Sequence, residues 1–467
     1  MDPGGPSESA GRASQLSFGQ HFLGRRFFAW LALIAVLALA GRVVYVVTVT
    51  HDDPNVYDAT YYELQAREIT HGQGFFKDPF LLFSDHPQDQ PAADHPPLTV
   101  FALLPAAFVE GPRASQYAMR FTMAIIGTAT VVLIGLLARR LGGDTVGLAA
   151  AVLAALDPNL WMNDGLIMSE ALSALLTVAL IGAAYLVIRR GTNWPRAVLL
   201  GLLAALGILA RAEFVLYVPF LVLPALWIGS RRDGRRDVRR AGAMVGIAVG
   251  VTLVVLAPWV AFNMSRFQEP TLISTNDGLA LRAANCDATF YGPRIGSVNV
   301  FPPCAQARDD REQSVWNAAN RSDALHYMAD HLDRIPVVAL TRVGRTWNLF
   351  NLRQSAYLAA YEGHPKWGTY IGAVVTWITV PLAVFGAIVL RRRRIAVWPL
   401  VVPVAITTIA IALWAGGLLR YRAPAEPSIV ILAVVGGVEL VRRERRRRAP
   451  ETAAHAAATP LTEGAPA

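Results

Sequence analysis

The sequence is short of charge. Only 16% of its 467 residues are Asp, Glu, Lys or Arg, whereas 54% are hydrophobic, and the mean hydropathy is +0.38. A soluble chain of this length needs more charge to cover its surface, so a soluble enzyme is excluded. Several uncharged runs reach the roughly 20 residues that a helix needs to cross a bilayer. The composition therefore predicts an all-α polytopic membrane protein.

Lysine is nearly absent as well: two of the 43 basic residues are Lys, and the others are Arg. The arginines form short clusters between the apolar runs, as the positive-inside rule predicts for the cytoplasmic side of a membrane protein. A nucleic-acid-binding protein would collect its positive charge on one surface, so we expect no nucleic-acid partner in spite of the net charge of +9. The clusters are Arg25–Arg26, Arg139–Arg140, Arg189–Arg190 and the runs 231–240, 391–394 and 442–448.

Placing every arginine cluster on the inner side predicts about ten spans, within a range of nine to thirteen. A shorter apolar segment at 96–108 is expected to be a re-entrant or interfacial helix. No cleavable signal peptide is expected, because the first apolar run is long and lacks a small-residue cleavage site. The expected spans are 27–49, 117–138, 146–158, 164–188, 196–210, 214–229, 241–262, 369–390, 396–416 and 428–441.

This arrangement of spans divides the chain into five parts. We expect the protein in the inner or plasma membrane of a bacterial cell, with both ends of the chain in the cytoplasm. The tails are rich in Ala, Pro, Gly, Ser and Thr, a composition typical of disorder. The parts are a disordered tail (1–24), a transmembrane module (25–262) whose first external loop is 50–95, an external loop or small domain (263–368), C-terminal transmembrane helices (369–441), and a basic, then disordered tail (442–467).

Cysteine is scarce too, and both cysteines fall in the external part at 263–368. Cys286 and Cys304 are 18 positions apart and have no zinc-site spacing. Outside the cytoplasm a disulfide is favoured over two free thiols. The same part contains an amphipathic helix at 312–336. The segment after it is either an interfacial helix or a packing helix of a small domain.

Acidic residues stand where external loops meet apolar sequence. Asp58 follows the first span, and Asp94 precedes the apolar segment at 96–108. Paired external carboxylates suit a general base together with an ion or a phosphate-bridging metal. The alternative for Asp58 is an ordinary helix N-cap. Asp52 and Asp53 are rivals for the same role.

Three short motifs carry a family resemblance. The first loop has Asp58, Tyr62, the run Ala66-Arg67-Glu68 and then Gly72; the second motif is the run 94–98, Asp-His-Pro-Pro-Leu, and the third is Glu170 in DGLIMSEAL. Over residues 25–230 the chain resembles the GT-C superfamily of polyprenyl-phosphate-sugar transferases. It is similar to the family of protein O-mannosyltransferases and the lipid A aminoarabinose transferase, glycosyltransferase family 39.

The resemblance implies a GT-C helical bundle that transfers a sugar, mannose or arabinose, from a polyprenyl phosphate to an acceptor hydroxyl of a glycan, lipid or protein outside the cytoplasm. Asp58 and Asp94 would be catalytic, with Asp58 as the general base of an inverting displacement. Asp94 is also the candidate ligand of a divalent cation, Mg²⁺ or Mn²⁺. Ala59 replaces a second acid of the family and His95 replaces a Lys, which leaves metal dependence open.

A departing phosphate needs positive charge, and external arginines can supply it. Glu170 would be a substrate-binding acid, or else a buried partner of an arginine. The alternative for an arginine at a membrane boundary is contact with lipid phosphates. The substrate-binding candidates are Tyr62, Arg67, His95, Glu170, Arg211, Arg420 and Arg422.

Two other classes compete with an enzyme. A transporter or flippase of lipid-linked envelope precursors would place charges near the bilayer midplane and repeat its halves. The predicted spans are mostly uncharged, and the halves differ. A non-catalytic scaffold in envelope assembly is the third class, and loss of sugar transfer after replacement of Asp58 separates it from an enzyme.

Overall fold

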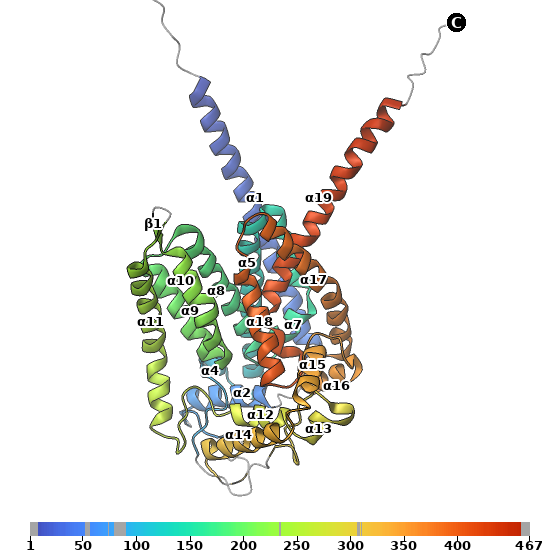
Figure 1. The fold of residues 1–467 in the computed structure, drawn as a ribbon. Helices are drawn as coiled ribbons and strands as arrows, with labels where there is room; N and C mark the ends of the chain where they lie inside the picture. Colours follow the sequence, from blue (N-terminus) through green and yellow to red (C-terminus); the bar gives the residue numbers. More distant parts are fainter. Residues whose placement is uncertain are drawn as a thin grey trace, which may run out of the picture.

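The structure is a computed structural model, and it describes residues 8–51, 57–72, 74–78, 90–232, 235–305, 309 and 311–458. It is a bundle of upright helices that rests on a layer of shorter helices, and the start of α1 (Glu8–Thr48) and the end of α19 (Glu426–Ala458) lie at the far end of the bundle (Figure 1). This arrangement confirms the predicted all-α polytopic fold.

The bundle contains α1 (Glu8–Thr48), α5 (Pro112–Gly142), α6 (Asp144–Leu156), α7 (Pro158–Asp164), α8 (Glu170–Arg190), α9 (Trp194–Ala210), η1 (Ala212–Leu216), η2 (Val218–Val222), α10 (Leu223–Gly229), α11 (Val238–Met264), α17 (Lys366–Arg392), α18 (Trp398–Leu413) and α19 (Glu426–Ala458). The other elements are α2 (Asp58–Thr70), α4 (Leu98–Ala107), α12 (Asp277–Ala284), α13 (Asp287–Phe290), η3 (Gly292–Arg294), α14 (Gln313–Asp330), α15 (Ile335–Thr346), α16 (Leu352–Tyr361) and η4 (Leu419–Arg422). An antiparallel pair of two-residue strands, β1 (Arg231–Arg232) and β2 (Arg235–Arg236), forms a tight turn before α11.

Each of the ten predicted spans coincides with helix, but fewer are long and apolar enough to cross a membrane alone. Within the described residues these are Arg26–Thr48, α5, α8, the run Ala212–Gly229, α11 and α17, and α6 with α7 adds a seventh if that pair, bent by 58°, is one span. α9 and α18 are shorter, with 17 and 16 residues, and α19 runs from Glu426 directly into the arginine cluster at its far end. The number of clear spans is therefore six or seven rather than ten.

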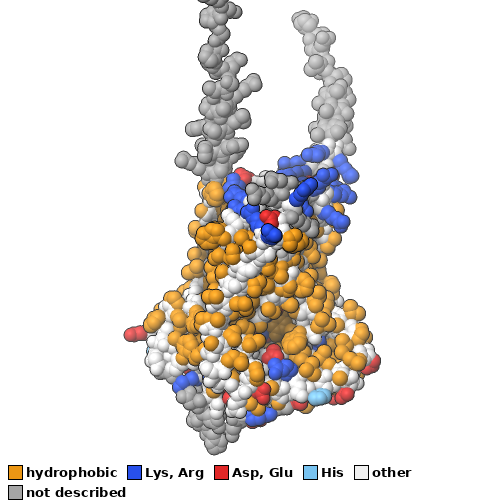
Figure 2. All heavy atoms as spheres, turned by 60° about the vertical axis from the view of Figure 1, so that its left-hand side comes forward, with side chains coloured by type: hydrophobic (Ala, Val, Ile, Leu, Met, Phe, Trp, Pro, Cys, Tyr) orange, Lys and Arg blue, Asp and Glu red, His pale blue; other side chains and the backbone are white. Residues whose placement is uncertain are grey.

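The arginine clusters share one end of the bundle. Arg189 donates a 2.8 Å hydrogen bond to the carbonyl of Arg140, which joins the ends of α8 and α5. At the ends of α17 and α19, Arg393 and Glu439 form a 2.6 Å ion pair. Figure 2 shows the basic side chains at this end, a broad apolar band below them and a mixed polar surface at the opposite end. The polarity is that of a membrane-spanning bundle.

Glycines allow α17 and α19 to pack closely. A Cβ atom at Gly386 would collide with the carbonyl oxygen of Leu432, and one at Gly436 would collide with that of Leu382. In a membrane, burying an apolar side chain against another helix gains no more than burying it in lipid. Membrane helices therefore associate through close van der Waals contact, which small residues allow. The contact fixes α19 and, with it, the η4 turn that precedes it.

The layer of shorter helices, called the outer layer from here on, is cross-linked by a disulfide and is also bonded to the first loop. Cys286 and Cys304 form the predicted disulfide. Gln313, at the start of α14, accepts 2.7 Å hydrogen bonds from the backbone N–H of Ala93 and from the hydroxyl of Thr275. The segment that carries Asp94 and His95 is therefore held by residues more than 180 positions later in the chain.

α15 is amphipathic with its polar face inward. Leu340 is 74% exposed, whereas Arg342 and Arg345 are 2% and 0% exposed. Arg342 donates to Asn285 Oδ1 at 3.0 Å, and Arg345 donates to the Ile295 carbonyl at 2.6 Å. The inward arginines pack α15 against neighbouring segments. An apolar outer face is typical of a helix that meets lipid at the membrane surface, and for α15 that contact stays a prediction.

We expect the disulfide to stabilise the outer layer. Closing an 18-residue separation contributes about 3 kcal/mol by the loop-entropy relation. The double substitution Cys286→Ser/Cys304→Ser should lower the melting temperature of the detergent-purified protein, and a reductant should lower that of the wild type. The double variant is the control, since a reductant should leave its melting temperature unchanged. Equal melting temperatures of both proteins without reductant would contradict the expectation.

Candidate active site

Arg420 is the centre of the candidate site. It lies in η4, just before α19, and its side chain is 8% exposed. Its Nη1 contacts Asp58 Oδ2 at 2.7 Å and Glu170 Oε1 at 3.2 Å. Its Nε contacts Glu362 Oε1 at 3.0 Å. Three carboxylates from distant parts of the sequence thus share one guanidinium, at the end of the bundle opposite the arginine clusters (Figure 1).

Asp58 is the first residue of α2, so it is not the helix N-cap that the sequence left as an alternative. The N-cap position belongs to Tyr57, whose φ of 51° lies in a region that non-glycine residues rarely adopt. The Asp58 carboxylate contacts Arg420 and, at 3.4 Å, His95 Nε2. Strain of this kind persists only where the surroundings fix the residue. The residue that follows Tyr57, Asp58, is held beside Arg420 and His95.

Arg211 extends the cluster on the far side of Glu170. Its Nη1 contacts Glu170 Oε1 at 3.0 Å, and its Nε forms an ion pair with Glu213. Glu170 stands in the first turn of α8 and is fully buried at its side chain. One of its oxygens accepts from both arginines, while Oε2 is buried and makes no hydrogen bond within the described residues. Both predicted roles of Glu170, arginine partner and substrate-binding acid, fit this geometry.

Tyr62 and His95 form one wall of the site. Their ring centroids are 5.0 Å apart, and Tyr62, which is 2% exposed, lies near Ser169, the residue before Glu170. Burial raises the pKa of Tyr62, and the charge of Asp58 raises it further, so the phenol remains protonated. The spacing of four residues between Asp58 and Tyr62 therefore places both side chains at one site, as the sequence predicts.

The two carboxylates that face Arg420 from α2 and from the turn before α17 differ in proton affinity. Burial alone would raise the pKa of Asp58, but Arg420 and His95 outweigh burial and hold it well below its ordinary value. Burial raises the pKa of Glu362 to about 7, because the attraction of Arg420 is opposed by the charges of Asp58 and Glu170. Asp58 therefore stays ionised, whereas Glu362 takes up a proton near neutral pH.

Glu362 was missed by the sequence analysis. It stands in the run Tyr-Glu-Gly-His-Pro at 361–365, between α16 and α17. Gly and Pro mark a turn there, and the turn immediately precedes a span. The reasoning that singled out Asp58 and Asp94, an acid where an external loop meets a membrane helix, would have identified Glu362 too.

Two predicted site residues, Arg67 and Asp94, have other contacts. Arg67 pairs with Glu63 one helical turn away, at 3.3 Å, and is 30% exposed at its side chain. Asp94 lies beside Tyr61: burial raises the pKa of that phenol, and the charge of Asp94 raises it further. Nothing in the described contacts brings Asp94 onto Arg420, so its catalytic role stays a prediction. The rival acids Asp52 and Asp53 lie outside the described residues.

Arg422 forms a second polar centre on the other side of η4. It pairs with Glu426 at 2.6 Å and donates to Thr376 Oγ1 at 2.8 Å and to the Thr346 carbonyl at 3.1 Å. It also hydrogen-bonds to Asn159. A guanidinium with this many partners connects four segments of the fold, and its predicted contact with substrate remains a prediction.

The donor set does not fit a divalent cation. In the described part of the chain, no group of three or more His, Cys, Asp and Glu side chains is placed to hold a metal ion. The carboxylates that converge, Asp58, Glu170 and Glu362, do so on Arg420, whose guanidinium supplies the positive charge. The role of Asp94 as a metal ligand therefore stays a prediction from the resemblance.

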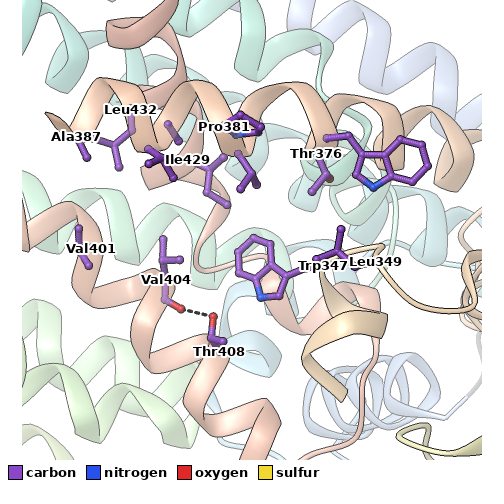
Figure 3. Close-up of a pocket in the computed structure, with 14 residues that line it drawn as sticks. Trp347, Leu349, Thr376, Pro381, Ala387, Val401, Val404, Thr408, Ile429 and Leu432 are labelled. Atoms are coloured by element: carbon purple, nitrogen blue, oxygen red, sulfur yellow. Dashed lines mark hydrogen bonds between the residues drawn. The ribbon is translucent and has the colours of Figure 1, made fainter. Parts of the chain in front are cut away.

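An apolar groove lies close to the second polar centre. It has a volume of about 540 Å³ and lies between α17, α18 and α19, with the end of α15 beside it (Figure 3). Trp347 and Leu349 line one end, and Val401 and Ala387 line the other. Thr376, which accepts the hydrogen bond from Arg422, is part of the wall. The groove thus begins at a buried cation and runs along apolar membrane helices.

Comparison with solved structures finds the same fold in the oligosaccharyltransferase AglB of Archaeoglobus fulgidus, solved with an inhibitory peptide and a dolichol-phosphate. The TM-score is 0.52 at 15% identity, over 91% of this chain and 52% of AglB, so this chain spans about half the length of that protein. Cupriavidus metallidurans ArnT, solved with undecaprenyl phosphate, gives a TM-score of 0.43 at 14% identity, over 87% of this chain and 77% of ArnT. The S. cerevisiae Pmt1-Pmt2 O-mannosyltransferase, solved with its sugar donor, gives 0.40 at 16%, over 56% and 36%. The likeness to AglB shows the fold and nothing beyond it.

The fold is therefore that of AglB, in agreement with the fold implied by the resemblance of the sequence motifs. Residues 94–262 match the model of the dolichyl-phosphate-mannose-protein mannosyltransferase family. Comparison with curated proteins finds no match. The matched region begins at Asp94 and ends in α11, so it contains His95, Glu170 and Arg211.

We expect Arg420→Met to destabilise the protein strongly, because it leaves Asp58 and Glu170 facing each other without their shared cation. Loss of one partner of a buried ion pair costs about 3–5 kcal/mol. Thermal unfolding in detergent measures the loss, and Arg420→Lys should recover part of it. Arg353→Ala, which removes an exposed cation from α16, is the control. A melting temperature of Arg420→Met equal to that of this control would contradict the central role of Arg420.

Proposed function

We propose that this protein is a membrane glycosyltransferase that moves a sugar from a polyprenyl-phosphate donor to an acceptor hydroxyl. The observation that carries the proposal is the convergence of Asp58, Glu170 and Glu362 on Arg420. Sugar transfer from a phosphate needs a carboxylate for the acceptor proton and a cation for the leaving phosphate. The matched family is named for dolichyl-phosphate-mannose, so a polyprenyl-phosphate mannose is the first donor to test and an arabinose donor the second.

We place the arginine-rich end of the bundle in the cytoplasm of a bacterial cell, following the positive-inside rule. Both ends of the chain are then cytoplasmic, and the Arg420 site faces the opposite side of the inner or plasma membrane. A disulfide in the outer layer supports this orientation, because disulfides persist outside the cytoplasm. The acceptor, a glycan, lipid or protein, would approach from the same side.

In the proposed reaction the acceptor oxygen attacks the anomeric carbon while Asp58 takes its proton. The new carbon–oxygen bond forms as the bond from that carbon to the phosphate oxygen breaks. The electron pair of the broken bond stays on the polyprenyl phosphate, where Arg420 and Arg211 stabilise the added charge. A single displacement inverts the configuration. The unpaired Oε2 of Glu170 offers an acceptor for a sugar hydroxyl.

Binding of the donor phosphate would also make Asp58 a stronger base. A carboxylate that contacts both Arg420 and His95 holds a proton weakly, so it is a poor base in this arrangement. A phosphate bound to Arg420 would compete with Asp58 for the guanidinium. Loosening that contact raises the proton affinity of Asp58, so the base would gain strength only when the donor is present.

The polyprenyl chain of the donor would occupy the apolar groove between α17, α18 and α19. The groove is lined by aliphatic and aromatic side chains and starts at Thr376, next to Arg422. Because lipid already surrounds a prenyl chain in the membrane, such a surface binds it through close van der Waals contacts rather than through removal from water. Val384 and Ala387 line the groove from α17.

We expect Asp58→Asn to abolish transfer, since Asn cannot accept the proton and general-base catalysis contributes about 10²–10⁴-fold. The measurement is the label passed from a radiolabelled polyprenyl-phosphate sugar to acceptor by purified protein. Asp330→Asn, which neutralises an exposed acid of the outer layer, should keep wild-type activity. Transfer that survives in Asp58→Asn would remove Asp58 as the base. Solute movement by reconstituted protein, without any glycosyl product, would favour the transporter class instead.

We expect Ala387→Phe to weaken binding of long-chain donors. The added ring occupies groove volume and removes van der Waals contacts with the chain. Losing about ten contacts of roughly 0.15 kcal/mol each raises KM about tenfold. The KM of a geranyl-phosphate donor, whose chain is short, should change little. The control is Val374→Phe on the same helix, at a position that is 48% exposed and outside the groove. An equal rise in KM for both donors would show that the groove does not hold the chain.

A further inference from the structure

Glu362 is held in a fixed position by the turn that contains it. Gly363, with φ of 88°, adopts a backbone conformation that favours glycine, and a Cβ atom there would stand 2.7 Å from Leu166 Cδ2. His364 is buried and its Nε2 lies 3.0 Å from Asn163 Oδ1 in α7. The two residues that follow Glu362 are therefore packed against the membrane bundle, and the Glu362 side chain, 15% exposed, faces Arg420.

The guanidinium of Arg420 divides its nitrogens between two sets of carboxylates. Nη1 donates hydrogen bonds to Asp58 Oδ2 and Glu170 Oε1 at 2.7 and 3.2 Å. Nε forms an ion pair with Glu362 Oε1 at 3.0 Å, without hydrogen-bond geometry, so the link to Glu362 is one of charge. A negative charge on Glu362 attracts the guanidinium and also repels the charge of Asp58. A protonated Glu362 does neither. The charge of Glu362 thus determines how much of the Arg420 charge remains for Asp58.

Glu362 can change its charge under ordinary conditions, because burial raises its pKa to about 7. The charged groups that face it are Arg420 on η4, Asp58 on α2 and Glu170 on α8. Arg420 favours the ionised form, while the two carboxylates oppose it. Tyr421, beside Arg420, remains protonated, since burial raises its pKa to about 12. The neighbouring His364 is neutral, because burial lowers its pKa to about 4.

We propose that Glu362 is a positioning residue of the transfer reaction, which acts through Arg420: when ionised, it draws the guanidinium away from Asp58 and makes Asp58 a better proton acceptor. The inference rests on the proposed function, in which Asp58 is the base. It adds a residue outside the matched region 94–262 and outside the motifs that carry the resemblance. The turn before α17 thereby couples the outer layer to the chemistry.

The sign of the pH dependence follows from the charge. As pH rises through about 7, Glu362 ionises, Asp58 becomes more basic, and kcat rises. We expect the wild type to be about tenfold faster at pH 8 than at pH 6, the effect of one unit in the proton affinity of the base. Glu362→Gln keeps the shape of the protonated acid, so its kcat should equal the wild-type value at pH 6 and stay flat up to pH 8.

The experiment is the kcat of the full-length protein with a polyprenyl-phosphate sugar between pH 6 and pH 8. Glu362→Asp should restore the rise with pH, and Asp330→Asn should leave it unchanged. A rise that survives in Glu362→Gln but disappears in His95→Gln would overturn the proposal, because histidines also change charge in this range and His95 contacts Asp58. A uniform loss of kcat at every pH in Glu362→Gln would also overturn it, since that is the signature of a structural role.

Different experimental results would contradict the proposed function and the role of Glu362. Wild-type protein that transfers no sugar from any polyprenyl-phosphate donor contradicts the proposed function. Wild-type protein that transfers sugar, with the same pH profile as Glu362→Gln, contradicts the role of Glu362 alone. A melting temperature of Glu362→Gln close to that of the wild type ensures that the comparison concerns folded protein.

Discussion

Burying a guanidinium is the constraint on which the rest of this structure depends. Removing an ion of this size from water costs several kcal/mol, and only partners in good geometry compensate. The partners of Arg420 come from α2, α8 and the turn before α17, separated in sequence from Arg420 by as many as 362 positions. The pairing is complete only when the bundle, the first loop and the outer layer are assembled together. Folding and formation of the site are therefore one event.

The same electrostatic rule organises the outer layer, where polarity is inverted relative to a soluble domain. On α15 the exposed side chains include Leu340, while Arg342 and Arg345 are buried against backbone carbonyls. A helix whose outer face meets lipid gains nothing by exposing charge, so its arginines turn inward and connect neighbouring segments. The outer layer also holds the segment before α4, through the hydrogen bond from Ala93 to Gln313.

The sequence could predict the features that depend on neighbouring residues or on the need of membrane helices to be apolar. Apolar runs identified the helices, and the Asp58–Tyr62 spacing placed both side chains at one site. The number of clear spans was overestimated, because bends and short helices depend on packing rather than on hydropathy. Arg67 was expected at the site, but a helical turn aims it at Glu63. Glu362 was missed although it, too, stands where a loop meets a membrane helix; its pairing with Arg420 could not be predicted, because that partner is distant in sequence.

The η4 turn joins the two environments that a lipid-linked sugar requires. Arg420 and Arg422 are two positions apart and have different partners: Arg420 contacts Asp58, while Arg422 contacts Thr376 in the wall of the apolar groove. In the proposed donor the phosphate lies between the prenyl chain and the sugar. If the chain lies in the groove and the sugar beside Asp58, the phosphate has to lie near this turn. The order of groups along the donor then matches the order of environments along the protein, which is why one short turn carries both arginines.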